Sequence, residues 1–240
     1  MIKRQSIRQG LILLSFFLFP ATFYYLSPVL ILEAAYNGIV NGSFIVFGLL
    51  FASALFLGRG WCGWLCPAAG CQEALFAARN KKINRCNWIK WMIWFPWMGS
   101  IIWLALRAGG YTEVKPLYQT VYGISVTDLQ SFMIYMAVLL VLIVLPSLAF
   151  GRRSFCHHLC WMAPFMIIGR KLGNGIRLHS LRLREEKEKC ARCHRCTEHC
   201  PMSLPVEDMV AKGKMEHSEC ILCGTCADTC REKTISLTFR

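Results

Sequence analysis

The sequence has 240 residues, a formal net charge of +13, a mean hydropathy of +0.40 and 55% hydrophobic residues, which is too apolar for an ordinary soluble domain. The charge does not indicate a nucleic-acid-binding protein either, because its excess lies in short segments beside apolar ones. Residues 1–175 carry 15 Lys and Arg against 4 Asp and Glu, whereas residues 176–240 carry 12 against 10. The sequence contains no basic face with aromatic or groove-reading motifs.

Four apolar segments are long enough to cross a bilayer, since about 20 residues span its hydrocarbon core. In chain order they are residues 11–32, 43–58 with its flanks, 88–106 and 131–150, of which the second is the shortest. Prolines within these segments predict kinked helices, because each proline removes one backbone hydrogen bond. The first segment follows basic residues, as a signal peptide does, but it is too long for one, and we expect an uncleaved anchor.

The distribution of Lys and Arg predicts the orientation of these segments. Basic residues are concentrated at the N-terminus, after the second segment and after the fourth, whereas the other two connections hold only Arg107 and Lys115. The positive-inside rule therefore predicts a multi-pass protein of a bacterial or archaeal inner membrane with both termini in the cytoplasm. All fourteen cysteines then face a reducing compartment, which agrees with spacings typical of metal ligands rather than disulfides.

Two C-x3-C motifs follow the second and the fourth apolar segments. The stretch "GRGWCGWLCPAAG" holds Cys62 and Cys66, and "GRRSFCHHLCWMAPF" holds Cys156 and Cys160. Both stretches begin with Gly-Arg, place an aromatic residue before the first cysteine and place a leucine before the second. Two spans followed by one motif therefore occur twice, which indicates an internal duplication.

Two cysteine runs near the C-terminus, "CARCHRCTEHCP" and "CILCGTCADTC", share the spacing C-x2-C-x2-C-x3-C. This spacing is typical of two-cluster bacterial ferredoxins, in which the fourth cysteine of each run binds the other cluster. We therefore predict two [4Fe–4S] clusters. Their ligands are Cys190, Cys193, Cys196 and Cys230 for the first, and Cys220, Cys223, Cys226 and Cys200 for the second. Structural zinc is the alternative, but a zinc site gains nothing from the fourth cysteine in both runs.

These patterns predict two domains. Residues 1–175 are expected to form a membrane all-α bundle of four transmembrane helices, built as a two-span repeat with two C-x3-C motifs. Residues 176–240 turn polar and charged, and they are expected to form a cytoplasmic α+β domain of the two-cluster ferredoxin type.

This order of spans, C-x3-C motifs and ferredoxin domain resembles the membrane iron–sulfur, or polyferredoxin, family. Within it the chain is similar to the NapH-like subunit of periplasmic nitrate reductase systems, and more distantly to the nitrous-oxide-reductase regulatory and cytochrome-oxidase assembly polyferredoxins. Cys62, Cys66 and Pro67 match the family's C-x3-C-P motif, whereas Trp161 replaces the proline after Cys160. The resemblance covers nearly the whole chain and implies electron transfer between membrane quinol and iron–sulfur partners.

The four membrane-edge cysteines leave three interpretations open. Cys62, Cys66, Cys156 and Cys160 together supply four thiolates, enough for a third [4Fe–4S] cluster if the two halves pack face to face. Redox-active thiols and inert thiols in helix-capping turns are the alternatives. We expect Cys71 and Cys86 to be buried, inert thiols, with Cys71 as a spare ligand in the alternative.

His157 and His158 lie between the second pair of cysteines. Imidazole titrates near neutral pH, so either histidine could contact a quinone or accept its proton. The alternative is an interfacial histidine that faces lipid headgroups or solvent.

The leading functional hypothesis is a membrane electron-transfer protein, a subunit of a quinol-linked oxidoreductase complex with a redox partner protein. A helper that reduces a metal ion or a thiol during the maturation of another enzyme is the second hypothesis. A membrane anchor that binds quinone only through a partner is the third.

Overall fold

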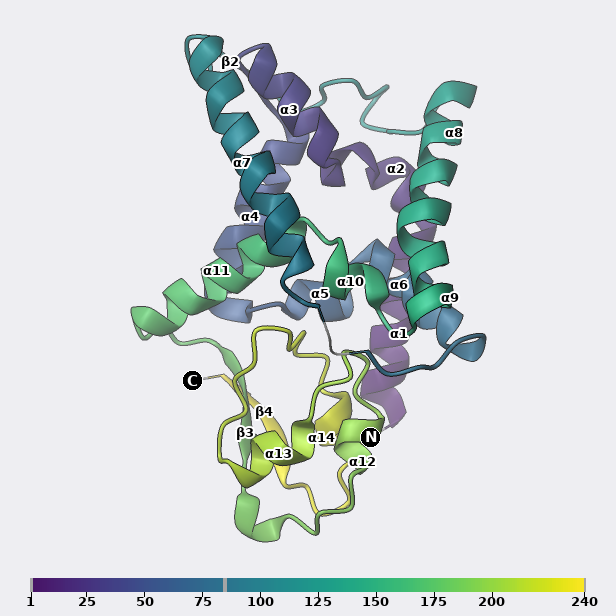
Figure 1. Ribbon diagram of the computed structural model, residues 1–240, viewed down its shortest axis with the longest axis vertical. Helices are drawn as coiled ribbons and strands as arrows, with labels where there is room; N and C mark the ends of the chain where they lie inside the picture. Colours follow the sequence, from purple (N-terminus) through teal and green to yellow (C-terminus); the bar gives the residue numbers. More distant parts are fainter. Residues whose placement is uncertain (1, 84–85, 240) are drawn as a thin grey trace.

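The computed structural model describes residues 2–83 and 86–239. Helices form the upper part of the molecule in Figure 1, and a smaller domain of short helices and two strands lies below them. Helix α1 runs from the upper part down to the smaller domain, so the two ends of the chain share the lower region (Figure 1).

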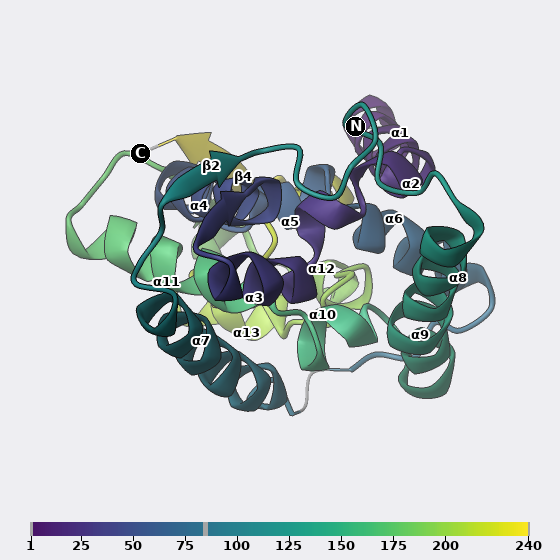
Figure 2. The same ribbon diagram turned by 90° about the horizontal axis from the view of Figure 1, so that it is seen from above.

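Two helices in the described part of the chain are long and apolar enough to cross a membrane. The first is α7, Ile89–Arg107. The second is continuous over Leu129–Phe150 and comprises α8 (Leu129–Val138), a π-helical stretch (Leu139–Val144) and α9 (Leu145–Phe150). These helices correspond to the predicted segments 88–106 and 131–150. In both views they stand apart, on either side of the short helix α10 (Figures 1 and 2).

The first two predicted segments form shorter helices. The segment at 43–58 becomes α4, Gly42–Leu57, which is apolar but has only 16 residues. The segment at 11–32, predicted to form a kinked helix, is divided more sharply, because its prolines begin new helices. Pro20 lies in the first turn of a new helix and Pro28 begins another, positions at which a proline lacks no needed hydrogen bond. The resulting elements are α1 (Ile2–Phe17), α2 (Phe19–Thr22), a 3-10 turn (Tyr24–Leu26) and α3 (Pro28–Tyr36).

The cysteine motifs follow these helices on short elements. They are α5 (Gly60–Trp64), α6 (Pro67–Ala74) with a 3-10 turn (Leu75–Ala77), α10 (Ser154–His158) and α11 (Met162–Gly175). Helix α11 packs closely on α4, because glycines face the α4 backbone. A Cβ atom on Gly173 would lie 2.5 Å from the carbonyl oxygen of Leu55. Two short parallel strands, β1 (Ile39–Asn41) and β2 (Glu113–Lys115), pair at the end of the upper part that lies away from the cysteine motifs (Figure 1).

The smaller domain closes with two antiparallel strands. β3 (Leu181–Glu185) pairs with β4 (Ile235–Phe239), with Leu183 opposite Leu237. Its other elements are a 3-10 turn (Lys187–Lys189), α12 (Arg195–Glu198), α13 (Val206–Ala211) and α14 (Thr225–Thr229). The mixture of short helices and strands agrees with the α+β prediction for residues 176–240.

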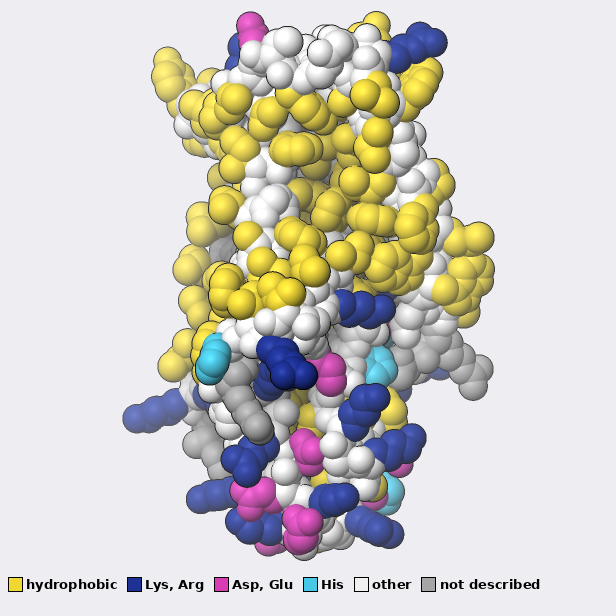
Figure 3. All heavy atoms as spheres, turned by 90° about the vertical axis from the view of Figure 1, so that its left-hand side faces the viewer, with side chains coloured by type: hydrophobic (Ala, Val, Ile, Leu, Met, Phe, Trp, Pro, Cys, Tyr) yellow, Lys and Arg dark blue, Asp and Glu magenta, His cyan; other side chains and the backbone are white. Residues whose placement is uncertain are grey.

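The surface reflects this division. In Figure 3 hydrophobic side chains cover most of the upper part, whereas Lys, Arg, Asp and Glu gather over the lower part. Exposed apolar side chains on the long helices include Phe95 and Trp103 on α7 and Met133 on α8. Such a surface is stable in contact with lipid rather than with water.

Candidate metal centres

The first predicted ligand set surrounds one cavity in the smaller domain. Cys190, Cys193, Cys196 and Cys230 all line a cavity of about 200 Å³. Cys193 is exposed and the other three are half-buried, so we call this the outer site. The structure thus brings together three cysteines of the first run and the last cysteine of the second.

The second predicted set lines a narrower pocket, of about 20 Å³, which we call the inner site. Its cysteines are Cys200, Cys220, Cys223 and Cys226, and its walls are apolar side chains such as Met202. Burial raises the pKa of the Cys200 thiol to about 11 and that of Cys220 to about 12. Ionised thiolates at this site therefore need compensating positive charge, which a bound metal cluster would supply.

The two cysteine runs share one backbone conformation. Arg192 and Leu222, at matching positions, both have φ of +49°, and His194 and Gly224 have φ of +59° and +74°. A short helix follows in each run, α12 or α14. Turns that contain left-handed residues direct successive backbone N–H groups into concavities that bind anions, including iron–sulfur clusters. The runs are therefore shaped to hold a negatively charged group.

The four C-x3-C cysteines come together where the two halves of the upper part meet. Cys62 lies in α5 and Cys66 just before α6, whereas Cys156 lies in α10 and Cys160 just after it. All four are 4–5% exposed and belong to one hydrophobic core. The Cys66 thiol lies within electrostatic reach of the other three. We call this arrangement the membrane-edge site.

Burial changes the acidity of these thiols. It raises the pKa of Cys62, of Cys66 and, to about 12, of Cys160. A thiol with a raised pKa is a poor nucleophile, so burial disfavours thiol exchange at this site. Gln72 Nε2 also donates a hydrogen bond to Cys156 Sγ over 3.3 Å, which orients that sulfur.

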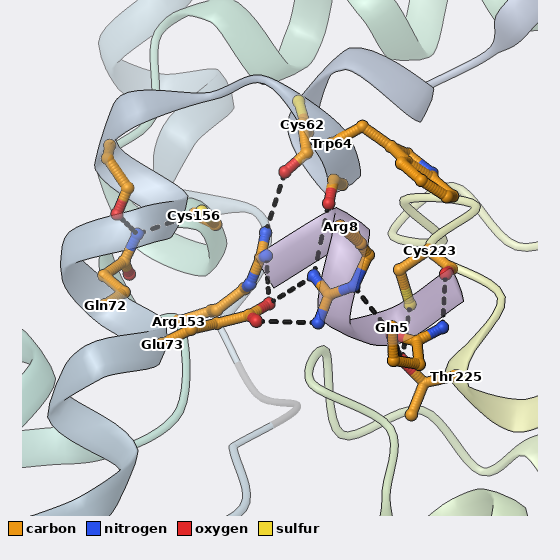
Figure 4. Close-up of polar contacts among 12 residues, drawn as sticks. Gln5, Arg8, Cys62, Trp64, Gln72, Glu73, Arg153, Cys156, Cys223 and Thr225 are labelled. Carbon is orange, nitrogen blue, oxygen red and sulfur yellow. Dashed lines mark hydrogen bonds and ion pairs between the residues drawn. The ribbon is translucent and has the colours of Figure 1, made fainter. Parts of the chain in front are cut away.

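A buried ion-pair cluster borders the membrane-edge site on one side (Figure 4). Arg8 Nη2 lies 2.8 Å from Glu73 Oε2, and Arg153 pairs with the other oxygen of the same carboxylate. Arg153 Nη1 also donates to the carbonyl oxygen of Cys62 over 3.0 Å. The second half of the repeat, through Arg153, thereby holds the backbone of the first.

Gln5 extends this cluster to the inner site (Figure 4). Its Oε1 accepts from Arg8 Nε over 2.8 Å, and its Nε2 donates to the carbonyl oxygen of Cys223 over 3.1 Å. The Thr225 hydroxyl donates to Gln5 Oε1 over 3.1 Å and lies 3.4 Å from Cys223 Sγ. Polar contacts therefore run without interruption from the membrane-edge site to the inner site.

A second ion-pair cluster lies between the upper part and the smaller domain. Glu219 binds Arg59 Nη1 over 2.8 Å and Lys90 Nζ over 2.6 Å, and all three side chains are almost fully buried. Burial opposes the ionisation of Glu219, but Arg59 and Lys90 outweigh it and lower its pKa to about 2. Because Glu219 directly precedes Cys220, this cluster fixes the start of the second cysteine run.

The loops of the membrane-edge and inner sites touch directly. A Cβ atom on Gly63 would lie 2.4 Å from the carbonyl oxygen of Ile221, so the Gly63 backbone is already packed against that loop. The indole N–H of the neighbouring Trp64 donates to the carbonyl oxygen of Leu222 over 3.2 Å. A residue beside Cys62 thus contacts residues beside Cys223.

Each of the three sites offers four cysteine sulfurs, the donor set of a [4Fe–4S] cube. Within residues 2–83 and 86–239, no three His, Cys, Asp or Glu side chains converge tightly enough to hold a single metal ion. A zinc ion binds its thiolates at about 2.3 Å, whereas a cube binds one thiolate at each of four irons and holds them further apart.

Comparisons with known proteins agree with this donor set. A family described as a 4Fe-4S binding domain matches residues 42–86 and 132–178, the two halves that carry the C-x3-C motifs. A family described as a 4Fe-4S dicluster domain matches residues 189–235. The ferredoxin-type protein NapH of Escherichia coli (strain K12) is 21% identical over 224 residues, which are 89% of this chain and 74% of NapH.

The chain is thus similar to the NapH-like polyferredoxins. YccM of the same organism is 27% identical over 199 residues, which are 78% of this chain and 51% of YccM. The regulatory protein NosR of Stutzerimonas stutzeri is 29% identical over 199 residues, which are 78% of this chain and 25% of NosR. The chain thus spans about half the length of YccM and a quarter of NosR. No solved structure matches.

The two matching families make the chain an iron–sulfur protein with ferredoxin-type 4Fe–4S domains, and its similarity to NapH supports a role in electron transfer. Together with its two long apolar helices, it also indicates a membrane protein. Relatives named for the Nap, Nos and Nir systems indicate redox partner proteins.

The two histidines of the second C-x3-C motif have different surroundings. His157 is fully buried and its Nδ1 lies 2.6 Å from Asn87 Oδ1, while burial lowers its pKa to about 3. An imidazole with that pKa is a poor proton acceptor near neutral pH. His158, in contrast, lines a cavity together with Phe150 and Ser154.

The two remaining cysteines also differ. Cys71 is buried in α6, and burial raises its pKa to about 11, as expected of an inert thiol. The prediction that Cys86 is buried is wrong, because this residue is exposed and has φ of +59°. It lies in the connection before α7 and lines the same cavity as His158.

An apolar cavity of about 340 Å³ reaches the membrane-edge site from between α3 and α8. Phe23, Val138 and Cys66 are among its walls, whereas neither His157 nor His158 is. The sequence analysis did not find this cavity, because the segments that enclose it are far apart in the chain.

The charged partners of the membrane-edge site have a signal in the sequence that the Gly-Arg alignment of the two motifs hides. An arginine stands three residues before the first cysteine of each motif, Arg59 before Cys62 and Arg153 before Cys156. Aligning the motifs on their cysteines rather than on Gly-Arg would have found this signal.

Proposed function

We propose that this polyferredoxin conducts electrons between a membrane quinone and a redox partner protein, through three iron–sulfur sites in the order membrane-edge, inner, outer. The observation that carries the proposal is the contact between Gly63, beside Cys62, and Ile221, in the loop of the inner site. It brings a buried four-cysteine site at the membrane helices against a four-cysteine site of the ferredoxin type.

The cysteines would hold the groups and the rest of the chain would set their surroundings. Bound [4Fe–4S] clusters would supply one-electron transfer, which suits the division of a two-electron quinol oxidation into single steps. The outer site would face the partner, because its Cys193 is exposed. The buried inner site would connect it to the membrane side.

Three observations support a cluster, rather than redox thiols, at the membrane-edge site. The two halves contribute two cysteines each to one buried group. The raised thiol pKa values disfavour thiol exchange. The 4Fe-4S binding family matches both halves of the repeat, including Cys62, Cys66, Cys156 and Cys160.

The apolar cavity beside Cys66 is the proposed quinone site. Its walls are mainly hydrophobic and aromatic, as a quinone ring and its isoprenoid tail require, and Ser27 and Glu33 add polar groups. This assignment replaces His157 and His158 as the proposed quinone contacts, because the cavity reaches Cys66 without them. We also propose four membrane spans with both termini and all three sites on the cytoplasmic side, as the distribution of Lys and Arg indicates.

Counting iron tests the proposal. Three cubes require about 12 Fe per chain and two require about 8. We expect Cys62→Ser and Cys160→Ser each to lower the iron content by about 4 and to remove one EPR signal, leaving the ferredoxin-type signals in place. Cys71→Ser is the matched control, because Cys71 is equally buried but belongs to none of the three sites. Iron content and EPR spectra that are unchanged in Cys62→Ser and Cys160→Ser would contradict a membrane-edge cluster.

A further inference from the structure

The repeat at the membrane-edge site is longer than C-x3-C. Arg59 and Arg153 each stand three residues before the first cysteine of their motif, and each occupies the N-cap position of the short helix that carries it. Their side chains are 2% and 0% exposed, so neither is a surface arginine. Two buried arginines at equivalent positions of a repeat indicate a shared role.

Both guanidinium groups retain unpaired N–H groups. Arg59 Nη1 binds Glu219 and the carbonyl oxygen of Ser218, but Arg59 Nε and Nη2 have no hydrogen-bond partner among the described residues. Arg153 Nε likewise has no hydrogen-bond partner among the described residues. A buried donor without a partner costs about 1–3 kcal/mol, and more when it is charged. Arg59 also interacts with the Cys62 sulfur, so these three nitrogen atoms indicate an acceptor at the cysteines of the membrane-edge site.

The membrane-edge cysteines are the neighbours of these groups. Arg59 lies within electrostatic reach of Cys62 and Cys160, and Arg153 within reach of Cys156. Cys62 is within reach of both arginines. A negatively charged group held by the four sulfurs would therefore lie beside the unpaired N–H groups.

The buried charges around the membrane-edge site also leave an excess of positive charge. Four buried or nearly buried cations, Arg8, Arg59, Lys90 and Arg153, share only two carboxylates, those of Glu73 and Glu219. An excess of two buried positive charges is unfavourable unless an anion compensates it. A [4Fe–4S] cube with four thiolate ligands carries about two negative charges in its oxidised form.

We infer that Arg59 and Arg153 are positioning residues that compensate the charge of the cluster at the membrane-edge site and raise its reduction potential. The inference rests on the proposed third cluster. Reduction adds a negative charge to the cluster, and two nearby cations with free N–H donors stabilise the reduced form more than the oxidised one. The two halves of the repeat would then contribute equally, two thiolates and one arginine each.

A redox titration of the full-length protein in detergent, followed by EPR, tests the inference. The relevant signal is the one that Cys62→Ser removes. We expect Arg59→Gln and Arg153→Gln each to disfavour reduction of this cluster about tenfold, which is about 59 mV for a one-electron couple. Each carboxylate keeps another cation, Lys90 for Glu219 and Arg8 for Glu73, so neither variant leaves an unpaired buried acid. Arg192→Gln, at an exposed arginine of the outer site, is the matched control and should leave this signal unshifted.

The possible outcomes are distinguishable. A wild-type protein with about 8 Fe and no signal dependent on Cys62 overturns the proposed third cluster itself. A signal with an unshifted potential in both Gln variants overturns the role of the arginines while the cluster stands. If the Gln variants lose the iron, Arg59→Lys and Arg153→Lys decide, because lysine keeps the charge. Recovery of the signal supports charge compensation, and its loss in the lysine variants overturns it.

Discussion

The inner site and the membrane-edge site lie on the two sides of one contact, and each gathers four buried or half-buried cysteines. The inner site takes three of them from a single seven-residue stretch, 220–226, with left-handed residues at Leu222 and Gly224. The membrane-edge site takes two from each of two motifs that lie on short helices in different halves of the chain.

This difference decides which groups can balance the charge of the thiolates. At the membrane-edge site the backbone N–H groups of Cys62, Cys66 and Cys160 already donate to the carbonyl oxygens of Arg59, Trp61 and Phe155. Helical turns thus use the amides that a ferredoxin loop directs toward its cluster. The amides of Ala69 and Ala163 still reach the sulfurs of Cys66 and Cys160, and the buried arginine side chains add to them. The comparison teaches that the geometry of a cysteine motif determines how much of its charge is compensated by side chains as well as by main chain.

The contact between the two regions gives the sharpest test of this comparison. Gly63→Ala places a Cβ atom 2.4 Å from the carbonyl oxygen of Ile221, so one of the two loops must move. We expect a loss of stability of about 1–3 kcal/mol, since overpacking a rigid contact costs that much, and earlier release of the smaller domain in limited proteolysis. Gly60→Ala is the matched control, because its Cβ would meet nothing closer than 3.7 Å. Equal melting temperatures for the two variants would show that the regions do not depend on this contact.

The membrane side of the comparison can be tested separately through the apolar cavity. Val138→Trp fills the cavity beside Cys66, whereas Val141→Trp, on the same continuous helix, adds the same side chain at an exposed position. We expect the first variant to slow reduction of the clusters by a quinol analogue about tenfold, or about 1.4 kcal/mol in the barrier. Stopped-flow absorbance at equal iron content measures this effect. Two variants with wild-type rates would argue against quinone in this cavity.

If only a metal ion or a disulfide substrate exchanges electrons with the clusters, the maturation-helper function is favoured.

We expect a smaller effect on stability from a substitution in the inner site, where the main-chain turn positions the cysteines. Gly224 has φ of +74°, and a Cβ atom there would lie 2.8 Å from Leu237 Cδ1, at the end of a flexible side chain. Gly224→Ala should lower the stability by about 1–2 kcal/mol, because non-glycine residues are disfavoured in this conformation. Gly48→Ala, in the middle of α4 with open space around it, should instead leave the stability unchanged or raise it slightly. Chemical denaturation of both variants makes the measurement, and a stable Gly224→Ala protein would contradict the need for this turn.

The sequence predicted local features better than distant ones. The spacing of the two runs predicts interleaved cysteine sets, and each set lines one cavity; their role as cluster ligands stays a prediction. The helices at 89–107 and 129–150 were predictable from apolar length alone. The break at Pro20 and Pro28 was underestimated, because membrane helices often tolerate proline and only the neighbouring structure decides.

The partners of the membrane-edge site could not be predicted in this way. Glu219 reaches Arg59 across 160 positions of the chain, and Arg8 reaches Glu73 across 65. Such pairs depend on how the smaller domain sits against the helices, which no local pattern of residues specifies. The exposed Cys86 is a similar case, since burial depends on what packs over a connection rather than on its composition.

The position of α1 also has a consequence for the order of assembly. Arg4 and Gln5 bind the Asp228 carboxylate across more than 220 positions, so this contact forms only after the second cysteine run has been synthesised. Contacts of such sequence separation form slowly. Until residues 220–228 have left the ribosome, the start of α1 lacks its partners. We therefore expect α1 to close over the second cysteine run late in assembly, after that run has become accessible for metal insertion.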